Sequence, residues 1–192
     1  SGSKRARLLD NVLAIGRNPP GGERRKDGPR PDVTPASLYF RHYLHRALDH
    51  AGRGDEVLAL LFPWREMLGM GLGTFPEFSD PTRSDSHAWT AHPALDLMGI
   101  VAGVRPGAPG FSRVVVEPHL ATLSTVGVRI PHPQGTIAVR YAAGARGIEA
   151  RVTLPPGLPG ELRAGGKVHP LRAGSETVVP LPARAAGTHA AR

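Results

Sequence analysis

The residues best suited to chemistry gather in one stretch of the chain, residues 71–89. Its sequence, GLGTFPEFSDPTRSDSHAW, contains Glu77, His87 and Trp89 together with two aspartates and an arginine. A carboxylate near imidazole and aromatic groups is suited to general acid–base chemistry on a polar substrate. Because glycines and prolines recur along the stretch, it predicts a long loop, and loops of this length are often functional. We therefore interpret it as a candidate site.

Glu77 is the strongest catalytic candidate, because it is the carboxylate flanked by Phe75 and Phe78. Packing against those rings would raise its pKa, whereas a nearby Arg83 or His87 would lower it. Either environment suits a general base. A solvated surface glutamate is the alternative.

The other candidate side chains have structural interpretations beside the functional ones. Asp80, Arg83 and Asp85 are better suited to a structural network that shapes the loop. His87 binds a sugar hydroxyl, positions Glu77, or caps the following helix. Trp64 and Trp89, the two tryptophans of the chain, either stack on a sugar ring or belong to the core.

Composition excludes several classes of protein. The chain has 192 residues, 40% of them hydrophobic, which is enough for a real core. It has no cysteine, so a disulfide framework and a thiolate nucleophile are excluded. No run of 18 apolar residues occurs, so no membrane span is predicted. The net charge of +8 comes mainly from scattered arginines without interleaved aromatics, and we expect no nucleic-acid partner.

Helical periodicity dominates the first half of the chain. Helices are predicted at residues 4–15, at 34–51 with Thr34 as N-cap and Pro35 as first helical residue, at 55–68 with a kink at Pro63, and from 91 or 93 to 102. His42 and His45 are three residues apart on the second helix, but no carboxylate stands beside them in a ligand pattern. We therefore predict no metal site and no cofactor.

After residue 103 the pattern changes to short strands separated by turns. Strands are predicted at residues 111–117, 126–130, 136–141, 147–154, 161–164, 167–171 and 177–181, the third and fourth forming a hairpin. The predicted class is α+β, with helices followed by a C-terminal antiparallel β-sandwich.

Several motifs occur in the order in which a known family carries them. They are WxxMLxxG (64–71), GTFPE (73–77), RSDSHAWTAHP (83–93), GIVAGVRPGAPGF (99–111), VVEPHL (115–120) and PHPQGTI (131–137). Together they resemble the C-terminal part of bacterial α-L-rhamnosidases of glycoside hydrolase family 78. The resemblance covers roughly residues 34–141.

The resemblance implies a fold and residue roles. It implies the last helices of a partial (α/α)6 barrel at 1–105, with an active-site loop at 69–92, a β-sandwich at 106–185 and a flexible tail at 186–192. It further implies an inverting hydrolase, with Glu77 as general base. His87, and less directly Trp64 and Trp89, would bind substrate.

Under this interpretation the general acid lies upstream of the chain, in a missing N-terminal part of the same enzyme. The partners would be that part and a glycan or glycoside with a terminal α-L-rhamnosyl group, and the fragment alone would be inactive. The alternative is a non-catalytic carbohydrate-binding or structural remnant. The sequence does not decide between a cytoplasmic and a secreted bacterial location.

Overall fold

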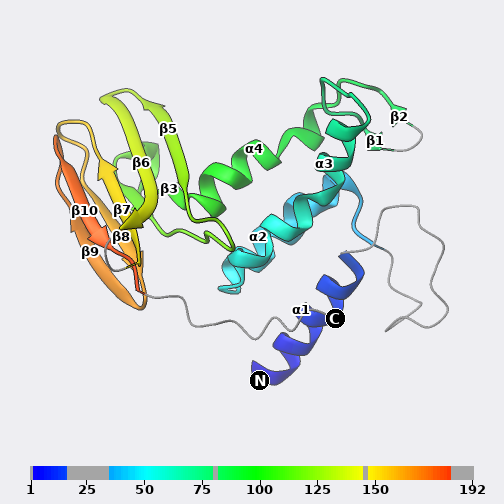
Figure 1. Ribbon diagram of the computed structural model, residues 1–192, viewed down its shortest axis with the longest axis horizontal. Coiled ribbons are helices and arrows are strands. Elements are labelled where there is room, and N and C mark those ends of the chain that lie inside the picture. Colours follow the sequence, from blue (N-terminus) through cyan, green and yellow to red (C-terminus); the bar gives the residue numbers. More distant parts are fainter. Residues whose placement is uncertain (1, 17–34, 80–81, 145–146, 183–192) are drawn as a thin grey trace. The chain divides into compact units, whose positions relative to one another are not determined.

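The protein comprises a helical unit and a β-rich unit. The computed structural model describes residues 2–16, 35–79, 82–144 and 147–182, and divides into Ser1–Leu97 and Met98–Arg192. The first unit is mainly helical and the second holds two four-stranded sheets (Figure 1). The predicted α+β class is thereby confirmed. Among the described residues, no helix has the length and apolarity needed to cross a membrane.

The helical unit consists of helices and turns, and its small hairpin and one of the 3-10 turns lie within loop 69–92. The elements are α1 (Gly2–Gly16), α2 (Leu38–His50), the 3-10 turns η1 (Gly54–Glu56) and η2 (Leu58–Leu61), α3 (Phe62–Gly69), a small hairpin of β1 (Phe78–Ser79) and β2 (Thr82–Arg83), the 3-10 turn η3 (Ala88–Ala91), and α4 (Pro93–Asp96), which leads into the π-helical segment η4 (Leu97–Val101). Leu38, Leu61, Trp64 and Met67 form a buried cluster in this unit.

Two helix starts differ from the sequence-based expectation. α2 begins at Leu38, because Ser37 has extended backbone angles and its hydroxyl accepts a hydrogen bond from Phe40 N at 3.4 Å. The predicted cap Thr34 lies outside the described residues. The predicted helix 55–68 is divided into η1, η2 and α3. Pro63 lies in the first turn of α3, where its missing N–H is harmless, and does not kink a continuous helix.

The β-rich unit contains β3 to β10. Their bounds are β3 (Val104–Pro106), β4 (Val114–Val116), β5 (Val126–His132), β6 (Gly135–Gly144), β7 (Gly147–Thr153), β8 (Gly160–Ala164), β9 (Lys167–Leu171) and β10 (Glu176–Pro180), with the short turn η5 (Pro109–Phe111) before β4. One sheet has the order β10-β7-β6-β5 and the other β3-β4-β8-β9. Apolar side chains from both sheets form one buried cluster, with Ile137, Tyr141 and Leu162 at its centre.

One pair of strands departs from the predicted antiparallel arrangement. β4 and β8 are parallel, with Val115 opposite Glu161. The chain between them forms three strands of the other sheet, so no hairpin forces these two strands to run in opposite directions. The predicted hairpin is confirmed, since β6 pairs with β7 in antiparallel register from Ala138–Thr153 to Gly144–Gly147. The tail at 186–192 lies outside the described residues.

Gly103 shows why the change from helix to strand requires a glycine. Its φ is +74°, and a β-carbon there would lie 2.1 Å from the carbonyl oxygen of Glu117. The carbonyl oxygen of Gly103 accepts a hydrogen bond from Glu117 N at 2.9 Å. The close approach of the two backbones therefore excludes any side chain at this position.

Candidate functional site

Hydrogen bonds fold the loop that carries Glu77 into a narrow ladder. The amide of His87 donates to Phe75 O at 2.6 Å, and the amide of Glu77 donates to Ser84 O at 3.2 Å. Beyond Glu77, Phe78 pairs with Arg83 across the β1–β2 hairpin. The ladder therefore brings the half-buried Glu77 opposite the segment that begins at Ser84 and ends at His87.

Ser84 is the strained residue of this ladder. Its φ is +50°, in the left-handed region that non-glycine residues seldom occupy. Its hydroxyl lies 2.9 Å from His87 Nδ1, while its carbonyl oxygen accepts the bond from Glu77. Strain of this kind costs on the order of 1–3 kcal/mol and concentrates at functional sites. Ser84 thus couples the backbone of Glu77 to the ring orientation of His87.

An aromatic surface adjoins the ladder. The centroid of the His87 ring lies 4.1 Å from that of Trp89, and the Trp89 ring lies 5.1 Å from Tyr39 on α2. Tyr39 and Tyr43 are joined through their hydroxyls at 2.9 Å. Trp89 remains 45% exposed and Tyr43 53% exposed. The arrangement leaves aromatic surface exposed on the segment that follows the ladder and on the adjoining face of α2.

Thr90 ties the loop to the helices beneath it. Its hydroxyl lies 3.0 Å from Pro76 O and 2.8 Å from His87 O, and it donates its single proton between these two carbonyls. Its own carbonyl accepts the indole N–H of Trp64 at 2.8 Å. Thr90 is fully buried and Trp64 is 7% exposed. Trp64 therefore binds Thr90 in the protein interior, whereas the ring of Trp89 is partly exposed to solvent.

We expect Thr90→Val to loosen the candidate site. The change keeps the side-chain shape but removes the donor shared by Pro76 O and His87 O, and an unpaired buried group costs about 1–3 kcal/mol. The expected result is faster amide exchange at Glu77 and His87, measured by hydrogen–deuterium exchange. Thr90→Ser, which keeps the hydroxyl, is the control. Equal exchange in both variants would contradict the assigned role of the hydroxyl.

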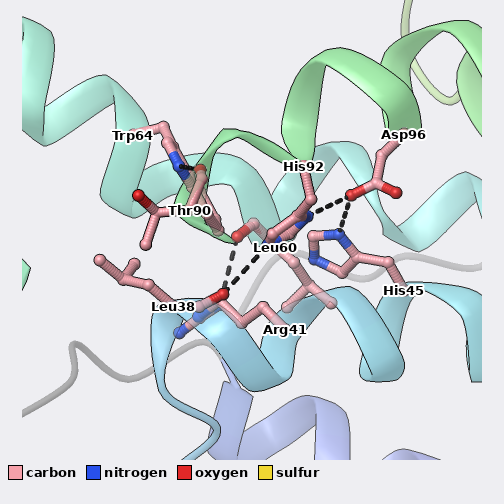
Figure 2. A network of polar contacts seen from close by, with 8 residues as sticks. All are labelled: Leu38, Arg41, His45, Leu60, Trp64, Thr90, His92 and Asp96. Carbon is pink, nitrogen blue, oxygen red and sulfur yellow. Dashed lines mark hydrogen bonds and ion pairs between the residues drawn. The ribbon is translucent and has the colours of Figure 1, made fainter. Parts of the chain in front are cut away.

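A buried polar network underlies Thr90 and Trp64. Asp96 Oδ2 lies 2.8 Å from His45 Nδ1 and 2.6 Å from His92 Nδ1, and His92 Nε2 lies 3.0 Å from Leu38 O (Figure 2). His45 is fully buried and Asp96 is 1% exposed. The His92 ring also packs edge-on against Trp64, with centroids 5.0 Å apart. The carboxylate of Asp96 on α4 thus joins α2, which carries His45, to the end of loop 69–92, which carries His92.

The proton inventory of the network follows from its geometry. Both ring nitrogens of His92 face oxygen atoms, Nδ1 that of Asp96 Oδ2 and Nε2 that of the Leu38 carbonyl. Burial would raise the pKa of Asp96, but hydrogen bonds from His45 and His92 outweigh burial and lower it. Burial lowers the pKa of His45 despite the bond to Asp96. Neutral His45 therefore donates through Nδ1 to an ionised Asp96.

Arg41 is a buried cation near the network. It is fully buried, and its Nη1–H donates to Leu60 O at 3.2 Å. The guanidinium carbon lies 5.1 Å from the centroid of the Phe62 ring. Burial lowers its pKa to about 10, with Glu66 opposing the shift. Even so, Arg41 is charged at neutral pH.

The structure brings only part of the sequence-predicted set together. His87 and Trp89 are in ring contact, and the ladder places Glu77 beside their segment. Phe75 and Phe78 are 40% and 44% exposed, so the flanking rings are open to solvent. Asp80 and the side chain of Arg83 lie outside the described residues. The carbonyl of Asp85 accepts a bond from the Thr74 hydroxyl.

Sequence reasoning missed His92, Asp96 and Thr90. His92 and Asp96 are four residues apart, a spacing that places two side chains on one face of a helix. That spacing, with His45 on another amphipathic helix, was the available signal. Thr90 carried no signal, because its role depends on carbonyls 14 and 3 residues away.

Comparison with known proteins supports a glycoside hydrolase relationship. Residues 103–169 match the family model described as the bacterial alpha-L-rhamnosidase C-terminal domain. No curated protein sequence gives a significant match. The resemblance to the C-terminal part of bacterial α-L-rhamnosidases, predicted from the sequence motifs, is confirmed by this match together with the solved structures that follow.

Three similar solved structures are rhamnosidases. A family 78 rhamnosidase of Bacillus sp. GL1 is 26% identical, with a TM-score of 0.60, over 82% of this chain and 18% of its own. The Streptomyces avermitilis α-L-rhamnosidase complexed with L-rhamnose is 21% identical, with a TM-score of 0.63, over 70% and 17%. The Aspergillus terreus enzyme is 21% identical, with a TM-score of 0.61, over 72% and 18%. The chain thus spans less than a fifth of the length of each.

Proposed function

We propose that this chain is the C-terminal part of an inverting α-L-rhamnosidase that hydrolyses terminal α-L-rhamnosyl linkages. Glu77 is the general base that deprotonates water, and the general acid belongs to an upstream part of the enzyme. In an inverting glycosidase the two carboxyl groups stand about 6.5–9.5 Å apart, which leaves room for the water. The observation that carries the proposal is the ladder that holds half-buried Glu77 beside His87 and the exposed aromatic surface.

His87 and Trp89 are assigned to substrate binding. The imidazole, oriented by Ser84, offers a hydrogen bond to a rhamnose hydroxyl, and the exposed Trp89 ring offers an apolar face to the C–H groups of the sugar. The ring of Trp64 is buried, so we assign it an indirect role, in which its indole N–H holds Thr90, and thereby the loop, in place. No metal or cofactor has a role in this chemistry.

The proposed architecture is a partial (α/α)6 barrel at 1–105, with the active-site loop at 69–92, followed by a β-sandwich at 106–185. Exposed large apolar side chains of the described residues support a missing barrel wall. Ten of the twelve lie in the helical unit: Leu8, Phe40, Tyr43, Leu68, Met70, Phe75, Phe78, Trp89, Leu95 and Leu97. Exposed apolar surface of this kind marks an interaction site. Apart from Trp89, which is assigned to the substrate, we assign these side chains to contact with the N-terminal part of the same enzyme.

The test compares the 192-residue chain with the same chain joined to its upstream barrel. An aryl α-L-rhamnoside is the substrate, and the anomer released first is identified by proton NMR. We expect negligible turnover by the chain alone, because it lacks the general acid, and release of β-L-rhamnose by the joined protein. Robust turnover by the chain alone, or release of the α-anomer, would overturn the assignment. If replacing Glu77 leaves the activity of the joined protein unchanged, the chain is better interpreted as a non-catalytic binding module.

A further inference from the structure

We propose that His42, His92 and Asp96 form a binding site for a divalent transition cation, with Zn²⁺ as the ion that fits the donor set. Each residue offers one ligand atom, and these atoms all lie within 4.8 Å of one another. His42 lies on α2, Asp96 lies on α4, and His92 is the residue immediately before α4. All three belong to the helical unit. The site does not include Glu77 and does not depend on the proposed catalytic function.

The chemistry of the donors defines the class of cation. Two imidazole nitrogens and one carboxylate oxygen are a ligand set that Zn²⁺ accepts, with water in the fourth position. Imidazole ligands suit first-row transition ions, whereas Mg²⁺ and Ca²⁺ prefer oxygen alone. The site should therefore discriminate Zn²⁺ and Co²⁺ from Mg²⁺.

Two of the three residues carry a buried atom that lacks a hydrogen-bond partner among the described residues. These atoms are His42 Nδ1 and Asp96 Oδ1. A buried polar atom without a partner costs about 1–3 kcal/mol. Both atoms have lone pairs that a cation can accept. A bound ion would therefore satisfy groups that the protein alone leaves unsatisfied.

The surrounding contacts orient the proposed ligands. His92 Nε2 lies 3.0 Å from the carbonyl oxygen of Leu38, so the proton on Nε2 can be held there while Nδ1 faces Asp96. Ligating histidines commonly donate their second N–H to a backbone carbonyl in this way. His45 Nδ1 lies 2.8 Å from Asp96 Oδ2 and fixes the carboxylate. The arrangement resembles the outer shell of a metal site.

Two features of the network oppose the cation and set the conditions for binding. His92 Nδ1 lies 2.6 Å from Asp96 Oδ2, and the proton between them must leave before a metal can take its place. The buried Arg41 adds a positive charge to the same region. We therefore expect affinity of moderate strength that increases with pH. Because His42 is only partly buried, we expect the cation to reach the site past this residue.

Co²⁺ titration of the 192-residue chain at pH 7.5 tests the proposal, because tetrahedral Co²⁺ gives strong visible absorption. We expect saturable absorption at one equivalent, displaced by Zn²⁺ but not by Mg²⁺. His42→Ala should weaken binding more than roughly 10-fold, since even removing an outer partner commonly costs 10–100-fold. His50→Ala, at an exposed position of the same helix, should leave the titration unchanged.

Thermal unfolding with Zn²⁺ gives a second readout on the same three proteins. We expect Zn²⁺ to raise the Tm of the wild type and of His50→Ala, because a ligand that binds only the folded state stabilises it. Adding Zn²⁺ should leave the Tm of His42→Ala unchanged. Absence of saturable Co²⁺ binding, or equal affinity in His42→Ala and the wild type, would overturn the site.

Discussion

Glu77→Gln is expected to lower the kcat of the joined enzyme by roughly 10²–10⁴-fold, the usual contribution of a general base. The amide has nearly the same shape as the carboxylate but cannot accept the proton of the attacking water. Because rhamnose binding is assigned to His87 and Trp89, the KM should change little. The measurement is steady-state hydrolysis of an aryl α-L-rhamnoside.

The matched control is Glu66→Gln, at an exposed glutamate of α3 outside the loop. It should keep wild-type kcat. A loss of less than about 10-fold in Glu77→Gln, with rhamnose affinity intact, would remove Glu77 from the role of base. The bacterial rhamnosidase resemblance would then support only a carbohydrate-binding or structural role for this chain.

Asp96→Asn is expected to have the largest effect on stability, at least about 3 kcal/mol, because hydrogen bonds to a charged group contribute about 1.5–3 kcal/mol each. The carboxylate is 1% exposed and is hydrogen-bonded to His45 and His92. The asparagine side chain offers one acceptor oxygen and no charge. Urea unfolding followed by tryptophan fluorescence reports on this unit, since Trp64 and Trp89 are the two tryptophans. A chelator keeps metal ions out of the comparison.

Asp55→Asn, at an exposed position of η1, is the control and should shift the midpoint little. If both variants unfold at similar urea concentrations, the network does not stabilise the helical unit.

The pH dependence of the Asp96 contribution has a defined sign. The pKa of Asp96 is lowered from 3.8 in the folded state, so the unfolded chain binds the proton more readily. Its stabilisation is therefore fully present above the unfolded-state value. It is lost as pH falls through the lower folded-state value. The difference in unfolding free energy between wild type and Asp96→Asn should therefore shrink as the pH falls through the acid range in which Asp96 is protonated.

Local patterns in the sequence were enough to predict most of the elements. Alternating apolar residues predicted the strands from 126 to 181, and the turn between β6 and β7 made that hairpin a local decision. The glycines and prolines of 71–89 likewise identified a loop, and Glu77 was its one carboxylate between aromatic residues. These features depend on neighbours within a few residues, so they can be read along the chain.

What only the tertiary structure decided are contacts between distant segments. The pairing of β4 with β8 joins strands separated by a whole sheet, and the His45–Asp96 bond joins residues 51 apart. Thr34 and Pro35 form an ordinary helix-start signal, yet the side-chain cap at Ser37 determines where α2 begins. Burial of Trp64 and exposure of Trp89 likewise depend on the packing of α2, α3 and η3. The sequence by itself determined the elements, the candidate loop and the family resemblance, whereas packing decided which side chains share an environment, because burial and pairing depend on long-range contacts.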